Sequence, residues 1–209
     1  MKIAREGYPW ILAAAILSVV AFSLGWNGMG GILVLFALSF AGFFRDPERT
    51  PPAGEGLVLA PADGKVVAIV RDGDEGKDAE GGYTRISIFL SLLDVHVNRA
   101  PIKGSVEKVQ YQPGKFHAAY REDASQDNEQ NAVRLVDSTG KSLKIVQIAG
   151  LLARRIICYV KEGETLERGQ RFGLIMFGSR VDLFMPPGSK VEVAEGQRVR
   201  AGETIIGRL

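Results

Sequence analysis

The stretch RFGLIMFGSRVDLFMP, residues 171–186, has the pattern of two β-strands that follow each other almost without a break. The pair Gly178-Ser179 lies between the two apolar halves, and the first proline comes only at Pro186. The pair lacks the Asn-Gly or Asp-Gly signal of a tight hairpin. Glycine inside a strand pattern marks a bulge or a close approach to the backbone by another group. We therefore expect an unusual strand junction at Gly178-Ser179.

The rest of the chain from residue 57 to residue 209 continues in short apolar runs bounded by turn residues, which is the pattern of β-strands. The clearest further runs are GLVLAPADG, KVVAIV, TRISIFLS, SVEKVQYQ, NAVRLVD, SLKIVQIAG, RIICYV, SKVEVA and TIIGRL. Residues 115–130 fit either a turn of helix or a polar loop. The sequence thus predicts a mainly β domain, either a sandwich or a barrel.

Two segments of this region repeat one pattern. EGETLERGQRFGLI begins at Glu162 and EGQRVRAGETIIGRL begins at Glu195. The repeat resembles the hammerhead turns of biotinyl- and lipoyl-carrier-like domains, so we expect a barrel-sandwich-like fold. The segment between the copies has no lysine flanked as a carrier requires, and such a fold signal says little about function.

Composition excludes several classes of function. The chain has 209 residues and a net charge of +2, which does not call for a nucleic-acid partner. The one cysteine, Cys158, rules out a disulfide framework and a cysteine metal site, and we interpret it as core filling. The two histidines, His96 and His117, are too few for a histidine-rich metal site. We expect no metal.

The N-terminal residues differ from the rest of the chain. Residues 8–26 and 30–44 are apolar and carry no charge, and only a glycine-rich turn, NGMG, joins them. Each segment is at or slightly below the roughly 20 residues that a helix needs to cross a bilayer. We predict a helical hairpin that crosses a membrane and returns, or that enters one leaflet.

Basic residues flank this hairpin on both sides. Lys2 and Arg5 precede it, and Arg45 and Arg49 follow it. The positive-inside rule then leaves both ends in the cytoplasm. A cleaved secretory signal has a similar start, but the second apolar segment and the arginines after it argue against one. We expect an anchor in the cell (inner) membrane and a catalytic or binding domain on the cytoplasmic side.

The predicted organisation therefore has three parts. Residues 1–44 form the membrane-anchoring helical hairpin, and residues 45–56, rich in proline and glycine, form a linker. Residues 57–209 form the β domain.

The Gly178-Ser179 junction has a specific chemistry available to it. In a distorted peptide the serine Oγ attacks the preceding carbonyl carbon and shifts the acyl group from nitrogen to oxygen. Elimination of the ester leaves dehydroalanine, which hydrolyses to a pyruvoyl group at a new N-terminus. Glycine at 178 removes steric hindrance, and the step needs a base and donors for the oxyanion. By itself, a Gly-Ser pair is also common in ordinary loops.

Six motifs in one order strengthen this interpretation: PADGKV, LSLLDVHVNRAP, YQPGKF, DNEQN, AGLLARRI and RFGLIMFGSRVDLFMP. In this order they resemble the phosphatidylserine decarboxylase family in its short, membrane-hairpin form. The resemblance covers roughly residues 45–209, and the two apolar segments fit it as well.

The resemblance implies a proenzyme that cuts itself between Gly178 and Ser179 into a long chain, 1–178, and a short chain, 179–209. Ser179 becomes a covalent pyruvoyl group, and no metal or diffusible cofactor is needed. The pyruvoyl carbonyl forms a Schiff base with phosphatidylserine from the membrane and accepts the electrons released as CO2 leaves. The product is phosphatidylethanolamine. The sequence leaves a homo-oligomer open.

The resemblance also implies roles for further residues. Asp63 in PADG has the pattern of a turn aspartate, but in this family context it is expected to be catalytic together with His96 and Ser179. Arg99 and Lys103 are expected to bind the substrate phosphate or carboxylate, or else are solvated charges. His117 is interpreted as a loop residue.

This chain departs from the longer members of the family at two places. They carry two histidines three residues apart, whereas here His96 matches the first and Arg99 stands in place of the second. The cleavage site is FGSR rather than LGST. Because arginine is a poor general base, either His96 takes the base role in self-cleavage, or His96 serves decarboxylation while Asp63 or a water assists cleavage.

An alternative from another class is a membrane-anchored, non-enzymatic lipid-binding or adaptor module with a barrel-sandwich domain. An adaptor typically carries long helical hairpins with heptads, which this sequence lacks. In a non-enzymatic module Gly178-Ser179 is incidental and the chain stays whole, so the cut distinguishes the two classes.

Overall fold

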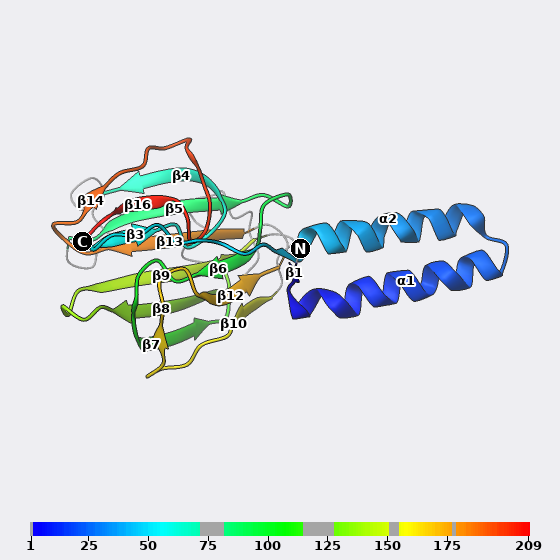
Figure 1. Ribbon diagram of the computed structural model, residues 1–209, viewed down its shortest axis with the longest axis horizontal. Coiled ribbons are helices and arrows are strands. Elements are labelled where there is room, and N and C mark those ends of the chain that lie inside the picture. The colour runs from blue at the N-terminus through cyan, green and yellow to red at the C-terminus, as the bar shows by residue number, and fades with distance from the viewer. Residues whose placement is uncertain (1, 72–81, 115–127, 151–154, 177–178) are drawn as a thin grey trace. The chain divides into compact units, whose positions relative to one another are not determined.

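The computed structural model describes residues 2–71, 82–114, 128–150, 155–176 and 179–209 (Figure 1). His117 and Gly178 lie outside these described residues. The chain divides into two compact units, Met1–Glu48 and Arg49–Leu209.

The first unit is a helical hairpin, as predicted. It contains β1 (Lys2–Ile3), a 3-10 turn (Arg5–Gly7), α1 (Tyr8–Ser23), α2 (Asn27–Phe43) and β2 (Arg45–Asp46). Proline in the first turn of α1 is favourable because its missing N–H has no helical partner there. Ser18 Oγ donates to the Gly30 carbonyl at 2.9 Å and joins the two helices, while β1 and β2 pair antiparallel.

Apolar side chains cover most of the hairpin, and many of them are exposed. Arg5–Ser23 is long and apolar enough to cross a membrane, whereas Asn27–Phe43 is apolar but shorter.

The second unit is built from short antiparallel strands, so the prediction of a mainly β fold behind an apolar helical hairpin is confirmed (Figure 1). The strands are β3 (Leu57–Leu59), β4 (Gly64–Val70), β5 (Thr84–Leu90), β6 (Val97–Arg99), β7 (Gly104–Gln112), β8 (Gln130–Val136), β9 (Ser142–Ala149), β10 (Ile156–Cys158), β11 (Thr165–Leu166), β12 (Arg171–Ile175), β13 (Ser179–Met185), β14 (Lys190–Val191), β15 (Arg198–Val199) and β16 (Ile205–Arg208). Strands β12 and β13 are the two predicted from residues 171–186.

The strand order is symmetric about the centre of a curled eight-stranded sheet. From one edge the order is β11-β7-β8-β9, and from the other it is β15-β4-β5-β13. The two small sheets, β10-β12-β6 and β14-β16-β3, correspond in the same way. Their hydrogen bonds repeat too, because Leu59 N donates to Pro101 O and Arg99 N donates to Pro61 O, both at 2.9 Å. The unit therefore consists of two halves related by an approximate two-fold axis.

The internal repeat in the sequence reflects this symmetry. Glu162 Oε1 accepts a hydrogen bond from Val109 N at 2.9 Å, and Glu195 Oε1 accepts one from Ile69 N at 2.8 Å. The two glutamates thus hold equivalent strands in the two halves.

A second repeat becomes visible only with the structure. The segments APADG (60–64) and APIKG (100–104) occupy equivalent places in the two halves. Asp63 in one half therefore corresponds to Lys103 in the other.

The core lies between one face of the eight-stranded sheet and the two small sheets. Fully buried side chains from both layers form one cluster, including Ile88, Ile145 and Val181 from the large sheet and Phe172 and Ile206 from the small ones. Cys158 packs against this cluster, as expected of a core-filling residue.

Candidate active site

Ser179 begins β13 in the middle of the eight-stranded sheet. It pairs with Leu90 of β5 on one side and with Ala149 of β9 on the other. Its side chain is fully buried, and its Oγ has no hydrogen-bond partner in the part of the chain that the structure describes. A buried hydroxyl without a partner is uncommon and needs an explanation. Here it leaves a nucleophilic oxygen uncommitted at the strand junction.

His96 lies in the connection between β5 and β6, six residues after Leu90, the residue of β5 that pairs with Ser179. Its carbonyl oxygen accepts a hydrogen bond from Ile175 N, at the end of β12, four residues before Ser179. Its Nδ1 lies 3.0 Å from the carbonyl oxygen of Asp94. Because a carbonyl only accepts hydrogen bonds, Nδ1 carries the proton, and the lone pair of the neutral ring is on Nε2. The buried ring is therefore set to act as a base through Nε2.

The turn before His96 is held by side-chain contacts. One carboxylate oxygen of Asp94 accepts hydrogen bonds from the backbone N and Oγ of Ser91, at 2.9 and 2.6 Å. The other pairs with Arg198 Nη1 at 3.1 Å. These contacts fix the segment that orients the imidazole.

Asp63 precedes β4 and is almost fully buried. Its two carboxylate oxygens accept hydrogen bonds from Arg49 Nη2 and from Ala201 N, each at 2.8 Å. Burial raises the pKa of Asp63 above its ordinary value, and the nearby Asp94 charge acts in the same direction. The Ala201 N–H and the Arg49 guanidinium oppose that rise in pKa. Asp63 thus holds a proton more tightly than a solvated aspartate.

Arg49 has a different place from the one that the sequence suggested. The sequence pattern predicts that it flanks the membrane anchor. In the structure its guanidinium bridges Asp63 and Glu203, with both distances at 2.8 Å. Its charge is therefore neutralised within the β unit.

Asp63 and Ser179 lie at the same end of the sheet, two strand spacings apart. Gly64 has φ +153°, and a Cβ there would collide with the Phe89 carbonyl oxygen, so the start of β4 lies tightly against the end of β5. Since β5 lies between β4 and β13, the lateral separation of Asp63 and Ser179 is about 10 Å. Asp63 can therefore reach the Ser179 hydroxyl only through another group, such as His96 or a water.

Lys103 lies at the other end of the sheet. As the two-fold counterpart of Asp63, it precedes β7 near the start of β9, whereas Ser179 pairs with the end of β9. Because β9 has eight residues, its ends lie about 24 Å apart. Lys103 Nζ pairs with Glu167 at 2.8 Å on the surface, beside a hollow of about 610 Å³. The structure does not bring Lys103 to Ser179.

Arg99 is buried and contacts the β11–β12 turn. Its Nη1 donates to the Gly169 carbonyl at 3.0 Å. A Cβ at Gly202 would lie 2.9 Å from Arg99 Cδ, so the arginine stem is covered by the Gly202 backbone. These contacts hold the side chain against two turns of the fold.

A chain of buried amides, which the sequence did not indicate, lies on the same face of the sheet as Ser179. Asn131 Nδ2 donates to Gln147 Oε1 at 3.0 Å, and Gln147 Nε2 donates to Asn98 Oδ1 at 2.9 Å. Gln147 is two residues before Ala149, so it is a diagonal cross-strand neighbour of Ser179, about 7–8 Å away. Asn98 Nδ2 has no hydrogen-bond partner among the described residues. The chain thus ends in the buried amide donor of Asn98, one hydrogen bond away from Gln147.

The sequence signal that could have indicated this amide chain is Gly173, a glycine inside a strand. A Cβ at this position would lie 2.7 Å from Gln147 Nε2 and 2.5 Å from the Ile157 carbonyl oxygen. The first glycine of RFGLIMFG therefore makes room for the amide of Gln147.

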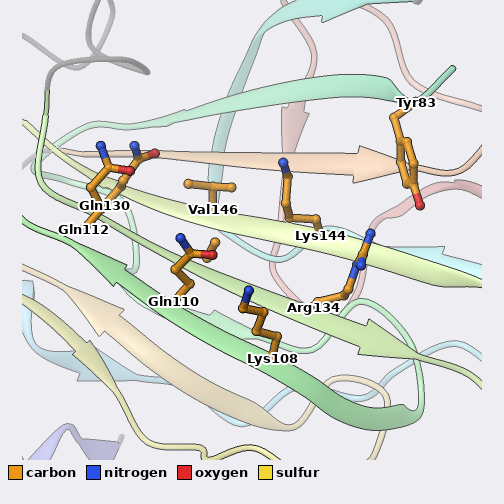
Figure 2. Close-up of a pocket in the computed structure, with 9 residues that line it drawn as sticks. Tyr83, Lys108, Gln110, Gln112, Gln130, Arg134, Lys144 and Val146 are labelled. Atoms are coloured by element: carbon orange, nitrogen blue, oxygen red, sulfur yellow. The ribbon is translucent and has the colours of Figure 1, made fainter. Parts of the chain in front are cut away.

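A polar groove of about 570 Å³ lies on the opposite face of the sheet (Figure 2). On β9 it is lined by Lys144 and Val146, which alternate with Gln147 and therefore face away from Ser179. Lys108, Arg134 and Lys144 stand opposite one another on neighbouring strands. Figure 2 shows these basic side chains toward one end of the groove and the glutamines toward the other. The groove is thus separate from the Ser179 site.

No group of three or more histidine, cysteine, aspartate or glutamate side chains with the geometry to hold a metal occurs among the described residues.

Comparison with known proteins identifies the family. The profile of the phosphatidylserine decarboxylase family matches residues 36–207. Proteins named phosphatidylserine decarboxylase proenzyme from Burkholderia vietnamiensis, Burkholderia cenocepacia and Burkholderia multivorans are each 44% identical over 207 residues, covering 99% of this chain and 96% of theirs. The chain therefore belongs to the phosphatidylserine decarboxylase family and is an enzyme of that family.

Proposed function

We propose that this protein is a self-processing decarboxylase that converts phosphatidylserine to phosphatidylethanolamine and CO2 with a pyruvoyl group made from Ser179. The observation that carries the proposal is the Ser179 Oγ, which is buried at the start of β13 and has no hydrogen-bond partner among the described residues. Family membership supports decarboxylation and processing of a proenzyme.

Self-cleavage uses Ser179 as the nucleophile and His96 as the base. The Oγ proton passes to His96 Nε2 while Oγ bonds to the Gly178 carbonyl carbon, and the bond from that carbon to the Ser179 nitrogen breaks as the nitrogen takes a proton. Loss of the Ser179 Cα proton then expels the Gly178 carboxylate and leaves dehydroalanine. One water replaces the nitrogen, which leaves as ammonia. The products are a long chain, 1–178, and a short chain, 179–209.

Asp63 supports these steps of self-cleavage through its raised pKa. Because its separation from Ser179 is about two strand spacings, it exchanges protons with the site through His96 or a water. Arg49 keeps the carboxylate of Asp63 oriented by an ion pair at 2.8 Å.

The residues around Ser179 fit a pyruvoyl group. This group is small and uncharged, and the cross-strand neighbours Leu90 and Ala149 are apolar and fully buried. The pyruvoyl carbonyl supplies Schiff-base chemistry, in which it binds the substrate amine and accepts the electron pair released with CO2.

The amide donor of Asn98 is suited to the substrate carboxylate. We assign Asn98 Nδ2 to one carboxylate oxygen of the serine head group, because Gln147 fixes the amide through Asn98 Oδ1. A neutral amide orients the carboxylate without the strong charge pairing that would stabilise the ground state. His96 holds at Nε2 the proton that the substrate α-carbon takes up after CO2 leaves.

The anchor fits a substrate that resides in a membrane. We propose that residues 1–44 form the anchor in the inner membrane, that residues 45–56 form the linker and that residues 57–209 form the catalytic domain on the cytoplasmic side. The apolar Arg5–Ser23 helix supports an anchor, and Lys2, Arg5 and Arg45 support the orientation. Arg49 belongs to the catalytic unit by its contacts.

The test is decarboxylation by purified full-length protein in detergent micelles that contain phosphatidylserine labelled in its carboxyl carbon. We expect labelled CO2 and an equal amount of phosphatidylethanolamine. A Ser179→Ala variant should release neither, whereas Gln110→Ala, in the groove on the other face, should match the wild type. Phosphatidylserine binding without CO2 release by the wild type would favour the non-enzymatic lipid-binding module instead.

A further inference from the structure

Two exposed leucines stand in the turn between β5 and β6, directly before the active-site histidine. Leu92 is 47% exposed and Leu93 is 84% exposed, the highest value for a large apolar side chain among the described residues. Within the described part of Arg49–Leu209, the only other exposed large apolar side chains are Val67, at 38%, and Tyr111, at 58%. Two of these four exposed side chains are thus adjacent in one turn, shortly before His96.

Hydrogen bonds close the turn that carries these leucines. Asp94 N donates to Ser91 O at 3.0 Å, which closes a β-turn with Leu92 and Leu93 at its centre. Ser91 also donates twice to the Asp94 carboxylate. The central positions of such turns usually hold proline, glycine, asparagine, aspartate or serine. These hydrogen bonds hold two exposed leucines at positions of the turn where polar or small residues are usual.

The turn adjoins the reacting groups on both of its sides. Leu90, which pairs with Ser179, comes just before Ser91, and His96 follows two residues after Asp94. A lipid with its head group at Ser179 and His96 has its acyl chains outside the site, where apolar side chains at the rim would meet them.

We propose that Leu92 and Leu93 form an apolar tip that inserts into the lipid surface carrying the substrate. The proposal rests on the proposed function, because the substrate must reside in that surface. A second protein is a poorer fit, since two leucine side chains offer much less than the roughly 800 Å² per partner of a stable interface. Shallow insertion into lipid requires only that these side chains leave water.

The first test measures insertion without activity. In a Cys158→Ser background, a Leu92→Cys variant of the full chain is labelled with an environment-sensitive dye and reconstituted into phosphatidylcholine vesicles with lipids brominated on their acyl chains. We expect strong quenching at position 92 and little at the matched Tyr111→Cys site, which is similarly exposed on β7. Equal, weak quenching at both positions would overturn the proposal.

The second test separates KM from kcat. In mixed micelles, the double variant Leu92→Ser/Leu93→Ser should raise the KM for the surface fraction of phosphatidylserine about tenfold or more, since each leucine loses the gain of leaving water. Self-cleavage and kcat/KM for a short-chain, monomeric phosphatidylserine should stay within about twofold of wild type. Leu93→Phe should retain the wild-type surface KM, and Tyr111→Ser should have no effect.

The outcomes distinguish this proposal from the proposed function. An unchanged surface KM, or an equal loss on the monomeric substrate, would refute the lipid-inserting tip. Quenching at position 92 in a protein whose wild type releases no CO2 from either substrate would support the tip and contradict the decarboxylase.

Discussion

Replacement of Arg49 by leucine tests the electrostatics of the site. The Arg49 guanidinium bridges Asp63 and Glu203, and the exposed fractions of the three side chains are 9%, 13% and 32%, respectively. Without Arg49, the Asp63 carboxylate stays buried with only the Ala201 N–H to stabilise its charge. The pKa of Asp63, already raised by burial, should then rise further.

The expected loss of stability follows from this geometry. Removing one partner of a buried ion pair costs roughly 3–5 kcal/mol, and we take about 3 kcal/mol because Asp63 keeps its backbone donor. At about 2–4 °C per kcal/mol for a chain of this size, the melting temperature should fall by about 6–12 °C. Glu203→Gln is the matched control, because it removes the more exposed ion pair, between Arg49 and Glu203, which contributes at most about 1 kcal/mol.

The pH dependence has a definite sign. Because the folded-state pKa of Asp63 is raised, protonation of Asp63 adds to the stability of the fold. This added stability is fully present below the ordinary pKa of 3.8 and is lost as the pH rises through the folded-state pKa. The destabilisation by Arg49→Leu should therefore be largest at neutral pH and shrink on acidification. Self-cleavage that depends on ionised Asp63 should likewise begin at a higher pH than in the wild type.

Thermal unfolding in detergent at pH 5 and pH 7.5, together with self-cleavage of freshly translated chains across the same range, measures both effects. The reasoning would be refuted by an Arg49→Leu protein that melts like Glu203→Gln at neutral pH. A destabilisation that grows toward acid pH would contradict it as well.

Three further substitutions test the assignments around Ser179. Asn98→Asp keeps the acceptor for Gln147 but replaces the donor, so the variant should still self-cleave while its CO2 release falls about 10- to 100-fold at neutral pH. A pH–rate profile should show partial recovery of CO2 release as the new carboxyl group is protonated. A pH–rate profile like that of the wild type would contradict the role of Asn98. Gly173→Ala places a Cβ against Gln147 Nε2, so melting temperature and CO2 release should both fall, and no change in either would argue against the amide chain. Lys103→Ala should leave the KM for phosphatidylserine within about twofold, because Lys103 lies at the other end of the sheet; a tenfold rise in KM would place it in the site after all.

Local patterns predicted most of the secondary structure, although the short strands β6, β11 and β15 were not among the predicted runs. Residues 171–175 and 179–185 are strands with Gly178-Ser179 at their junction, and the two apolar segments are helices. Alternation of apolar residues and turn residues acts over a few positions, so sequence alone reveals it.

Contacts between distant residues were not predictable in the same way. Asp63 meets Ala201 across 138 positions and Asn98 meets Gln147 across 49, and no local pattern encodes such pairings. The position of Lys103 was likewise not predictable, because it depends on the approximate two-fold axis. The segment of Lys103 repeats that of Asp63 in the other half, and the axis places it at the opposite end of the sheet from Ser179. Arg49 followed the anchor in sequence, yet its partners belong to the β unit.

The central claim is that Ser179 becomes a pyruvoyl group through self-cleavage, and intact-mass measurement of the freshly purified full-length chain tests it most directly. We predict two chains, 1–178 and 179–209, the second lighter by one ammonia than a chain that begins with serine and resistant to N-terminal degradation, while Ser179→Ala remains a single chain. A single uncut chain from folded wild-type protein, or a short chain with a free serine amine, would contradict the account.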